Sequence, residues 1–151
     1  RSIRRGNDHV SWTTPSGFVV HQKRDNLTTK RINLSVLGGC KISITNGESG
    51  PNARKHKSSG APNVIHSLDA SLLHIAFQRF DVPFSVIHDS VLCRATDMSC
   101  LGAIVRETYM HLFAEHDYLT DFAQQIGAET EPPIIGDLEP ESVIESTYFF
   151  C

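Results

Sequence analysis

The chain has 151 residues, 40% of them hydrophobic and 21% charged, which are the proportions of a soluble globular protein. No apolar run approaches the roughly 18 residues that a membrane-spanning helix needs, so an integral membrane protein is not expected. The net charge of −3 hides a division: residues 1–60 carry eleven Lys/Arg against three acids, and residues 61–151 carry three against fourteen. This asymmetry favours nucleic acid as a partner over a merely solvated basic face.

Turn and strand patterns fill the first 45 residues. The stretch "WTTPSGF" (12–18) has turn chemistry, and 18–22 reads as a strand. β-Branched residues that alternate on both sides of a Gly-Gly pair predict a β-ribbon over 28–45. Residues 46–60 are polar and rich in Gly and Ser, which predicts an exposed basic loop.

The period of the apolar residues changes after residue 60. Apolar side chains recur at helical spacing over 61–80, where Pro62 suits a helix start and Asn63 could cap it. The apolar positions are Ile65, Leu68, Leu72, Leu73, Ala76, Phe77 and Phe80. We therefore expect a helix that packs one face against the rest of the chain.

The second half reads as a short hairpin followed by helices. Residues 84–94 predict a strand, a tight turn and a second strand, and 98–116 and 118–126 predict helices. An acidic, proline-broken loop is expected over 127–141. The aromatic chain end, 142–151, is expected to pack against the body of the protein because aromatic burial is favourable.

The stretch "FSVIHDSVLC" (84–93) places Asp89 between two apolar, strand-like runs. A carboxylate at a strand–turn junction suits Mg²⁺, which binds few protein carboxylates and keeps several waters. A two-metal site requires a second acid, and the nearest candidates are Asp69, Asp81 and Asp97. Local chemistry alone favours an ordinary Asp-Ser hairpin turn.

The predicted ribbon carries polar side chains at alternate positions. Arg31 and Asn33 share a face, as do Lys41 and Ser43 on the partner strand. A two-stranded ribbon fits the major groove of DNA, where Arg can bind guanine and Asn adenine. An exposed polar hairpin face is the alternative interpretation.

Two further polar groups stand out. Arg54, Lys55 and Lys57 could contact phosphates or simply be solvated. His66 and Asp69 lie three apart on the predicted helix and can face one side. No zinc-binding pattern accompanies them, so the polar edge of a packed helix is the favoured interpretation.

Several of these stretches occur together in one known family. "PNxIHSxDxS" (62–71), then "HDS" (88–90), with "WTTPSGF" and "KRINL" (30–34) upstream, resembles the single-subunit, phage-T7-like DNA-directed RNA polymerases. "PNARKHK" (51–57) and the ending "STYFFC" (146–151) are similar to the mitochondrial members. The ordered set is much more specific than "HDS" alone.

The resemblance implies an α+β fold, the C-terminal part of a right-hand polymerase. A segment over about 17–60 would form the promoter-specificity hairpin and a basic loop. Residues of about 61–151 would form the palm helix, the motif C hairpin, the C-terminal helices and a C-terminal foot, which includes Phe150 and Cys151.

The implied activity is template-dependent nucleotidyl transfer from nucleoside triphosphates to an RNA 3′ end by two-metal catalysis. Asp89 would be one of two aspartates that bind two Mg²⁺ ions, flanked by His88 and Ser90, and His66 would lie near the nucleotide and the RNA end. The other aspartate would lie upstream of these residues. The 151 residues alone are therefore not expected to polymerise.

By the same resemblance, the side chains of Arg31, Asn33, Lys41 and Ser43 read promoter bases. Lys41 and Ser43 replace different polar residues of the phage enzyme, so its base preference does not carry over. The implied partners are DNA template and promoter, nascent RNA, nucleoside triphosphates and mitochondrial transcription factors, with no membrane. The implied location is the mitochondrion; another organelle and a phage-encoded, cytoplasmic protein are the alternatives.

Two other functions remain open at this point. An A-family-like DNA polymerase palm usually carries Glu after the motif C Asp, where this chain has Ser90, and lacks the ribbon. A non-catalytic nucleic-acid-binding module would explain the basic half and the incomplete site.

Overall fold

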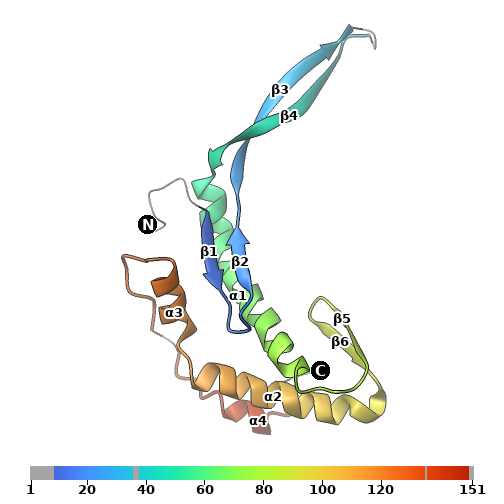
Figure 1. Cartoon of the computed structure of the whole chain (residues 1–151), viewed down its shortest axis with the longest axis vertical. Coiled ribbons are helices and arrows are strands. Elements are labelled where there is room, and N and C mark those ends of the chain that lie inside the picture. The colour runs from blue at the N-terminus through green and yellow to red at the C-terminus, as the bar shows by residue number, and fades with distance from the viewer. Residues whose placement is uncertain (1–8, 36–37, 135, 150–151) are drawn as a thin grey trace.

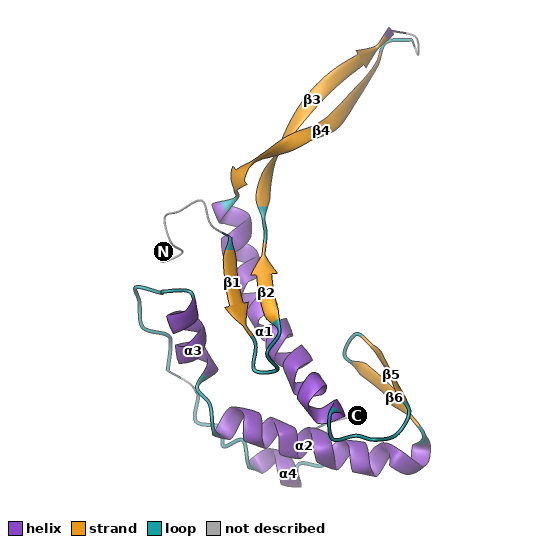
Figure 2. Cartoon of the chain, viewed as in Figure 1, coloured by secondary structure: helices purple, strands orange, loops and turns teal. Residues whose placement is uncertain are grey.

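The computed structural model describes residues 9–35, 38–134 and 136–149. Across these ranges three antiparallel hairpins and a helical base give a mixed α+β structure (Figures 1 and 2). The elements are β1 (Val10–Thr13), β2 (Val19–Gln22), β3 (Asp25–Leu34), β4 (Cys40–Pro51), α1 (Ala53–Phe77), β5 (Phe84–Ile87), β6 (Ser90–Cys93), a 3-10 turn η2 (Ala95–Asp97), α2 (Met98–Ala114), α3 (Tyr118–Gln125) and α4 (Ser142–Glu145). No helix in the described ranges combines the length and apolarity needed to cross a membrane.

The predicted ribbon is present and longer than expected. β3 and β4 pair from Asp25↔Pro51 to Leu34↔Cys40 and project away from the helical base (Figure 1). The register shifts twice near the base of the ribbon, which lets the polar, glycine-containing end of β4 stay paired with β3. Main-chain hydrogen bonds rather than side chains hold this end of β4, so the side-chain composition of the segment did not predict a strand.

The predicted basic loop over 46–60 is wrong, because β4 extends to Pro51 and helix α1 follows almost at once. Helix α1 begins at Ala53, so residues 53–60 are helical. The cap is Asn52, whose side chain accepts a hydrogen bond from the Lys55 N–H at 2.9 Å, and not Asn63. Pro62 lies inside the helix, where it removes one backbone donor but does not end the element.

Contacts from β2 hold this early part of α1 in place. The Gln22 side-chain amide donates to the His56 carbonyl at 3.1 Å and lies 3.3 Å from its Nδ1. The Asn63 amide donates to Gln22 Oε1 at 3.0 Å. Gln22 and His56 are both buried. These long-range contacts stabilise a helical segment whose own Gly, Ser and Pro residues favour a loop.

The core forms where the end of α1 packs against α2. Ala76 and Phe80 meet Leu101 and Val105, and all four side chains are buried. Further apolar side chains pack on this cluster, among them Leu72, Phe77, Val82, Val91, Ile104 and Phe149. The prediction that the aromatic chain end packs on the body is thus confirmed for Phe149, whereas Tyr148 beside it is 86% exposed.

Truncation of Leu101, which is fully buried in this core, should loosen the α1–α2 packing. We expect Leu101→Ala to cost about 2–5 kcal/mol of local stability, because it leaves a cavity. Native-state hydrogen exchange of the α2 amides measures this loss. The control is Leu138→Ala, since Leu138 is 72% exposed and should change protection little. Equal effects of both variants would contradict the assignment of the core.

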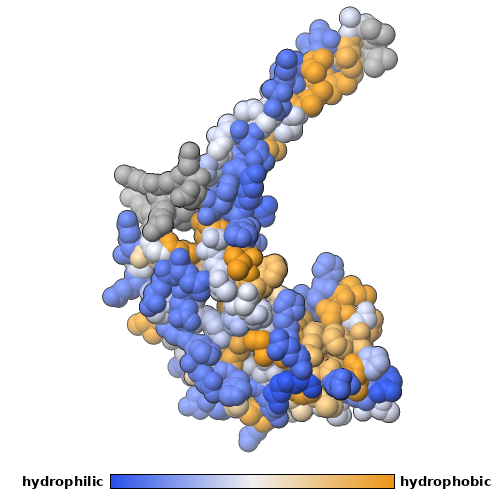
Figure 3. Space-filling model, viewed as in Figure 1, coloured by the Kyte–Doolittle hydropathy of each residue, from blue (hydrophilic) through white to orange (hydrophobic). Residues whose placement is uncertain are grey.

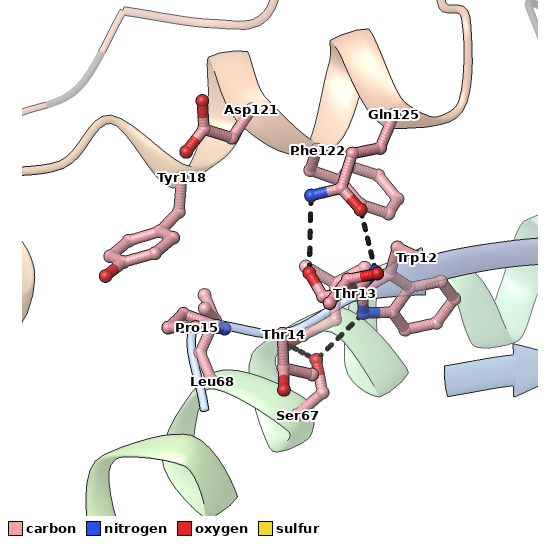
Figure 4. A pocket seen from close by; sticks show the side chains of 11 residues that line it. Trp12, Thr13, Thr14, Pro15, Ser67, Leu68, Tyr118, Asp121, Phe122 and Gln125 are labelled. Atoms are coloured by element: carbon pink, nitrogen blue, oxygen red, sulfur yellow. Dashed lines mark hydrogen bonds between the residues drawn. The ribbon is translucent and has the colours of Figure 1, made fainter. Parts of the chain in front are cut away.

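Hairpin β1–β2 docks between α1 and α3 (Figure 4). The buried Trp12 donates from its indole N–H to Ser67 Oγ at 3.1 Å and meets the Phe122 ring edge-on at 5.5 Å. The Gln125 side chain accepts from the Thr13 N–H at 2.7 Å and donates to the Thr13 carbonyl at 3.2 Å. Because β2 leads directly into β3, this docking fixes the base of the ribbon against the helices.

A small pocket remains within this docking interface. Tyr118 and Asp121 line it from α3, and burial and then the nearby Asp121 and Glu115 carboxylates raise the pKa of Tyr118. The pocket shares no lining residue with the cavity beside Asp89 described below. We therefore treat it as part of the packing of β1–β2.

Candidate active site and nucleic-acid interface

The predicted hairpin around Asp89 is confirmed. β5 and β6 pair from Phe84↔Cys93 to Ile87↔Ser90, which leaves His88 and Asp89 as the turn. His88 has φ 53°, in the left-handed region that non-glycine residues seldom occupy. A tight turn with this backbone places the main chain of Asp89 at the tip of the hairpin, with its side chain exposed.

His88 and Asp89 line a cavity of about 440 Å³ together with His66 and Asp69 of α1. The remaining lining residues are all apolar, namely Ala70, Leu72, Leu73, Val105 and Phe149. The structure thus brings together three predicted site residues that are up to 23 positions apart in the sequence. Ser90 begins β6, pairs with Ile87 and is not among the lining residues.

The donor atoms at this cavity suit a hard cation. Asp69 and Asp89 are exposed, and neither carboxylate forms a hydrogen bond or an ion pair in the part of the chain described. Mg²⁺ is commonly held by one or two such carboxylates, with water and substrate phosphates completing its shell. Among the described residues no group of three His, Cys, Asp or Glu side chains could hold a metal by itself.

The predicted polar face of the ribbon is also present. Arg31 lies directly opposite Ser43, and Asn33 opposite Lys41, and all four are exposed. Directly opposed residues of an antiparallel pair share a face, so the four side chains form one polar surface. The opposite face carries apolar residues, with Ile32 facing Ile42, and apolar residues are visible toward the outer part of the ribbon in Figure 3.

The three predicted phosphate contacts lie at the start of α1. Arg54, Lys55 and Lys57 are exposed there, close in sequence to the base of the ribbon. Cations at a helix N-terminus are unfavourable with respect to the helix dipole, and the first turn contains no acid. Their position is therefore poor for helix stability and suitable for a bound anion.

Residues 2–133 match the family model described as DNA-dependent RNA polymerase. The chain belongs to this family. The match confirms the resemblance found in the ordered motifs.

Relatives of the chain include polymerases of phages and chloroplast and mitochondrial polymerases of plants. The chain is 32% identical to T7 RNA polymerase of Escherichia phage T7 over 159 residues, which cover 94% of the chain and 18% of that protein. It is 32% identical over 152 residues to DNA-directed RNA polymerase 2, chloroplastic/mitochondrial, of Arabidopsis thaliana, and the match covers 95% of the chain and 15% of that protein. The DNA-directed RNA polymerase of Pseudomonas phage phiKMV is 29% identical over 145 residues, and the match covers 94% of the chain and 18% of that protein. The chain thus spans less than a fifth of each of these relatives.

Two lining residues carried little signal in the sequence. Asp69 was one of three candidates for a second acid but otherwise looked like the polar edge of a packed helix, and its place beside Asp89 marks it as part of the cavity. Phe149 belongs to the aromatic chain end, and the α2 contacts described below bring it to the cavity wall. The predicted foot residues Phe150 and Cys151 lie outside the described residues.

Proposed function

We propose that this chain is the C-terminal catalytic part of a single-subunit, right-hand DNA-directed RNA polymerase. The observation that carries the proposal is the cavity in which Asp89 and His88 of the hairpin face His66 of α1, in a member of this family. The reaction is template-directed transfer of a nucleotidyl group from a nucleoside triphosphate to the RNA 3′ end. Its substrates are the four nucleoside triphosphates, the DNA template and the nascent RNA.

In this proposal Asp89 contributes one carboxylate to a pair of Mg²⁺ ions, and the second aspartate comes from outside this chain. When bound, the ions activate the 3′-hydroxyl and stabilise the charge that develops at the α-phosphate. The tight turn keeps Asp89 in place, and His88 and Ser90 shape that turn. His66 lies on the α1 wall of the same cavity, where it can face the nucleotide and the RNA end.

The ribbon supplies the proposed contact with promoter DNA. The residues Arg31, Asn33, Lys41 and Ser43 are exposed on one face of the ribbon, and the ribbon projects away from the helices, as base reading in a major groove requires. The cations at the start of α1 would hold backbone phosphates beside the ribbon. Mitochondrial transcription factors are proposed to assist this recognition.

The proposed location of the parent protein is the mitochondrion, supported by the sequence stretches 51–57 and 146–151. Relatives carry chloroplast, mitochondrial and phage names, so another organelle or a phage-encoded, cytoplasmic protein are the alternatives.

The proposed function is tested by primer extension on an RNA–DNA scaffold. The full-length parent polymerase with Mg²⁺ and the four ribonucleoside triphosphates should extend the RNA with the complement of the template. Extension with deoxyribonucleotides only would instead support the DNA polymerase alternative. Scaffold binding without any extension would support the non-catalytic module and contradict the proposal.

A further inference from the structure

Helix α2 holds the end of the described chain by two contacts. The Arg106 guanidinium donates from Nη2 to the Ser146 carbonyl at 2.7 Å, across 40 positions of sequence. One turn further along α2, the Tyr109 ring meets the Phe149 ring in a T-shaped arrangement at 5.0 Å. Arg106 and Tyr109 are three apart and so lie on one side of the helix. We call these two contacts the α2 clamp.

The clamp acts on a segment that reaches the proposed active site. α4 packs on α2 and buries Val143, and Ser146 follows α4 immediately. Phe149 then lies against the core cluster and lines the cavity that contains Asp89, His88 and His66. The position of one cavity wall therefore depends on how residues 146–149 are held on α2.

Arg106 loses more hydration in this position than a residue with a purely stabilising role would need to lose. Its Nε is buried and has no hydrogen-bond partner within the described residues, so the single bond to Ser146 replaces only part of its lost hydration. Arg106 is half-buried, and a partly buried charge that is only partly satisfied contributes little net stability, so a well-packed apolar side chain often does better. What the guanidinium does supply is direction, because its N–H points at one particular carbonyl.

We propose that Arg106 is a positioning residue for nucleotidyl transfer: it fixes the C-terminal segment so that Phe149 forms a wall of the Asp89 cavity. The proposal rests on the proposed function for its catalytic consequence. Arg106 acts through Phe149 and does not itself line the cavity. Release of the clamp should let Phe149 leave the wall and let water and misaligned nucleotides occupy its place.

Steady-state kinetics of the full-length polymerase on the RNA–DNA scaffold test the catalytic part. We expect Arg106→Ala to lower kcat about tenfold while KM for the nucleotide changes less, since small misplacements near reacting groups are costly. Arg106→Lys retains a donor for the Ser146 carbonyl and should restore most of the rate. The control is Arg79→Ala, which removes an exposed arginine that contacts Glu107 of the same helix at 2.7 Å, and it should leave kcat unchanged.

A double variant shows whether Arg106 works through Phe149. In the Phe149→Ala background, Arg106→Ala should cause no further loss of kcat, because the wall that Arg106 positions is already absent. The proposal would be overturned if the fold-losses of kcat from the two single variants multiplied in the double variant. It would also be overturned if Arg79→Ala lowered kcat as much as Arg106→Ala.

Hydrogen exchange tests the clamp independently of any activity. Arg106→Ala should accelerate exchange in residues 142–149 and leave the protection of α2 intact. Loss of protection along the whole of α2 would show that Arg106 is a general structural residue and would overturn the proposal. If the parent protein makes no RNA, the proposed function fails, while the exchange experiment still decides whether the clamp exists.

Discussion

Asp89→Asn should lower Mg²⁺-dependent RNA synthesis by the full-length polymerase roughly 10³-fold or more, since a catalytic metal supplies several kcal/mol of charge stabilisation. The amide keeps the shape of the side chain but removes the negative charge. Binding of the DNA template should survive, because the ribbon and the start of α1 do not depend on this turn. Extension on an RNA–DNA scaffold measures the rate, and a gel-shift or anisotropy titration measures binding.

The matched control for this experiment is Asp81→Asn. Asp81 is exposed, lies after the end of α1 and is absent from the residues that line the Asp89 cavity. The control should retain nearly full activity. Synthesis that persists in Asp89→Asn, or that falls equally in Asp81→Asn, would reject Asp89 as a metal ligand.

Arg31→Ala combined with Asn33→Ala should weaken initiation at a promoter far more than elongation. Each lost two-bond base contact is worth about 1–3 kcal/mol, so the double variant should lower promoter-dependent initiation by roughly 30-fold or more. Elongation from a preassembled scaffold bypasses promoter reading and should change little. The ratio of the two rates, measured at one fixed salt concentration, is the informative quantity.

The ribbon provides its own control in Lys30→Ala. Lys30 pairs with Ile44 and belongs to the opposite face, so this variant removes a positive charge from the same strand without touching the polar face. It should reduce promoter initiation only slightly. Equal losses in initiation and elongation for the double variant, or an equal effect of Lys30→Ala, would argue against promoter reading by Arg31 and Asn33.

The start of α1 shows where sequence reasoning failed. Residues 53–60 contain helix-breaking and polar side chains, and local propensity assigned them to a loop. The Asn52 cap and the contacts of Gln22 with His56 overrode that propensity. Gln22 lies 34 positions before His56, so no local window could contain this information.

Local patterns determined the elements that depend on local physics. Partial alternation of β-branched residues marked the ribbon, the two-residue period of a strand placed Arg31 and Asn33 on one face, and an apolar–polar–apolar run marked the hairpin of Asp89. The ordered motifs determined the family, which the family match confirms. The ribbon face and the Asp89 hairpin need only the period of a strand and the chemistry of a turn.

Only the tertiary structure decided which side chains share the cavity. His66, Asp69, Asp89 and Phe149 are spread over more than 80 positions, yet all line one space. They meet because burial of the core between α1 and α2 sets the angle of the helices, and the α2 clamp then brings the chain end to the same place. Packing of this kind depends on long-range contacts and leaves no periodic mark in the sequence.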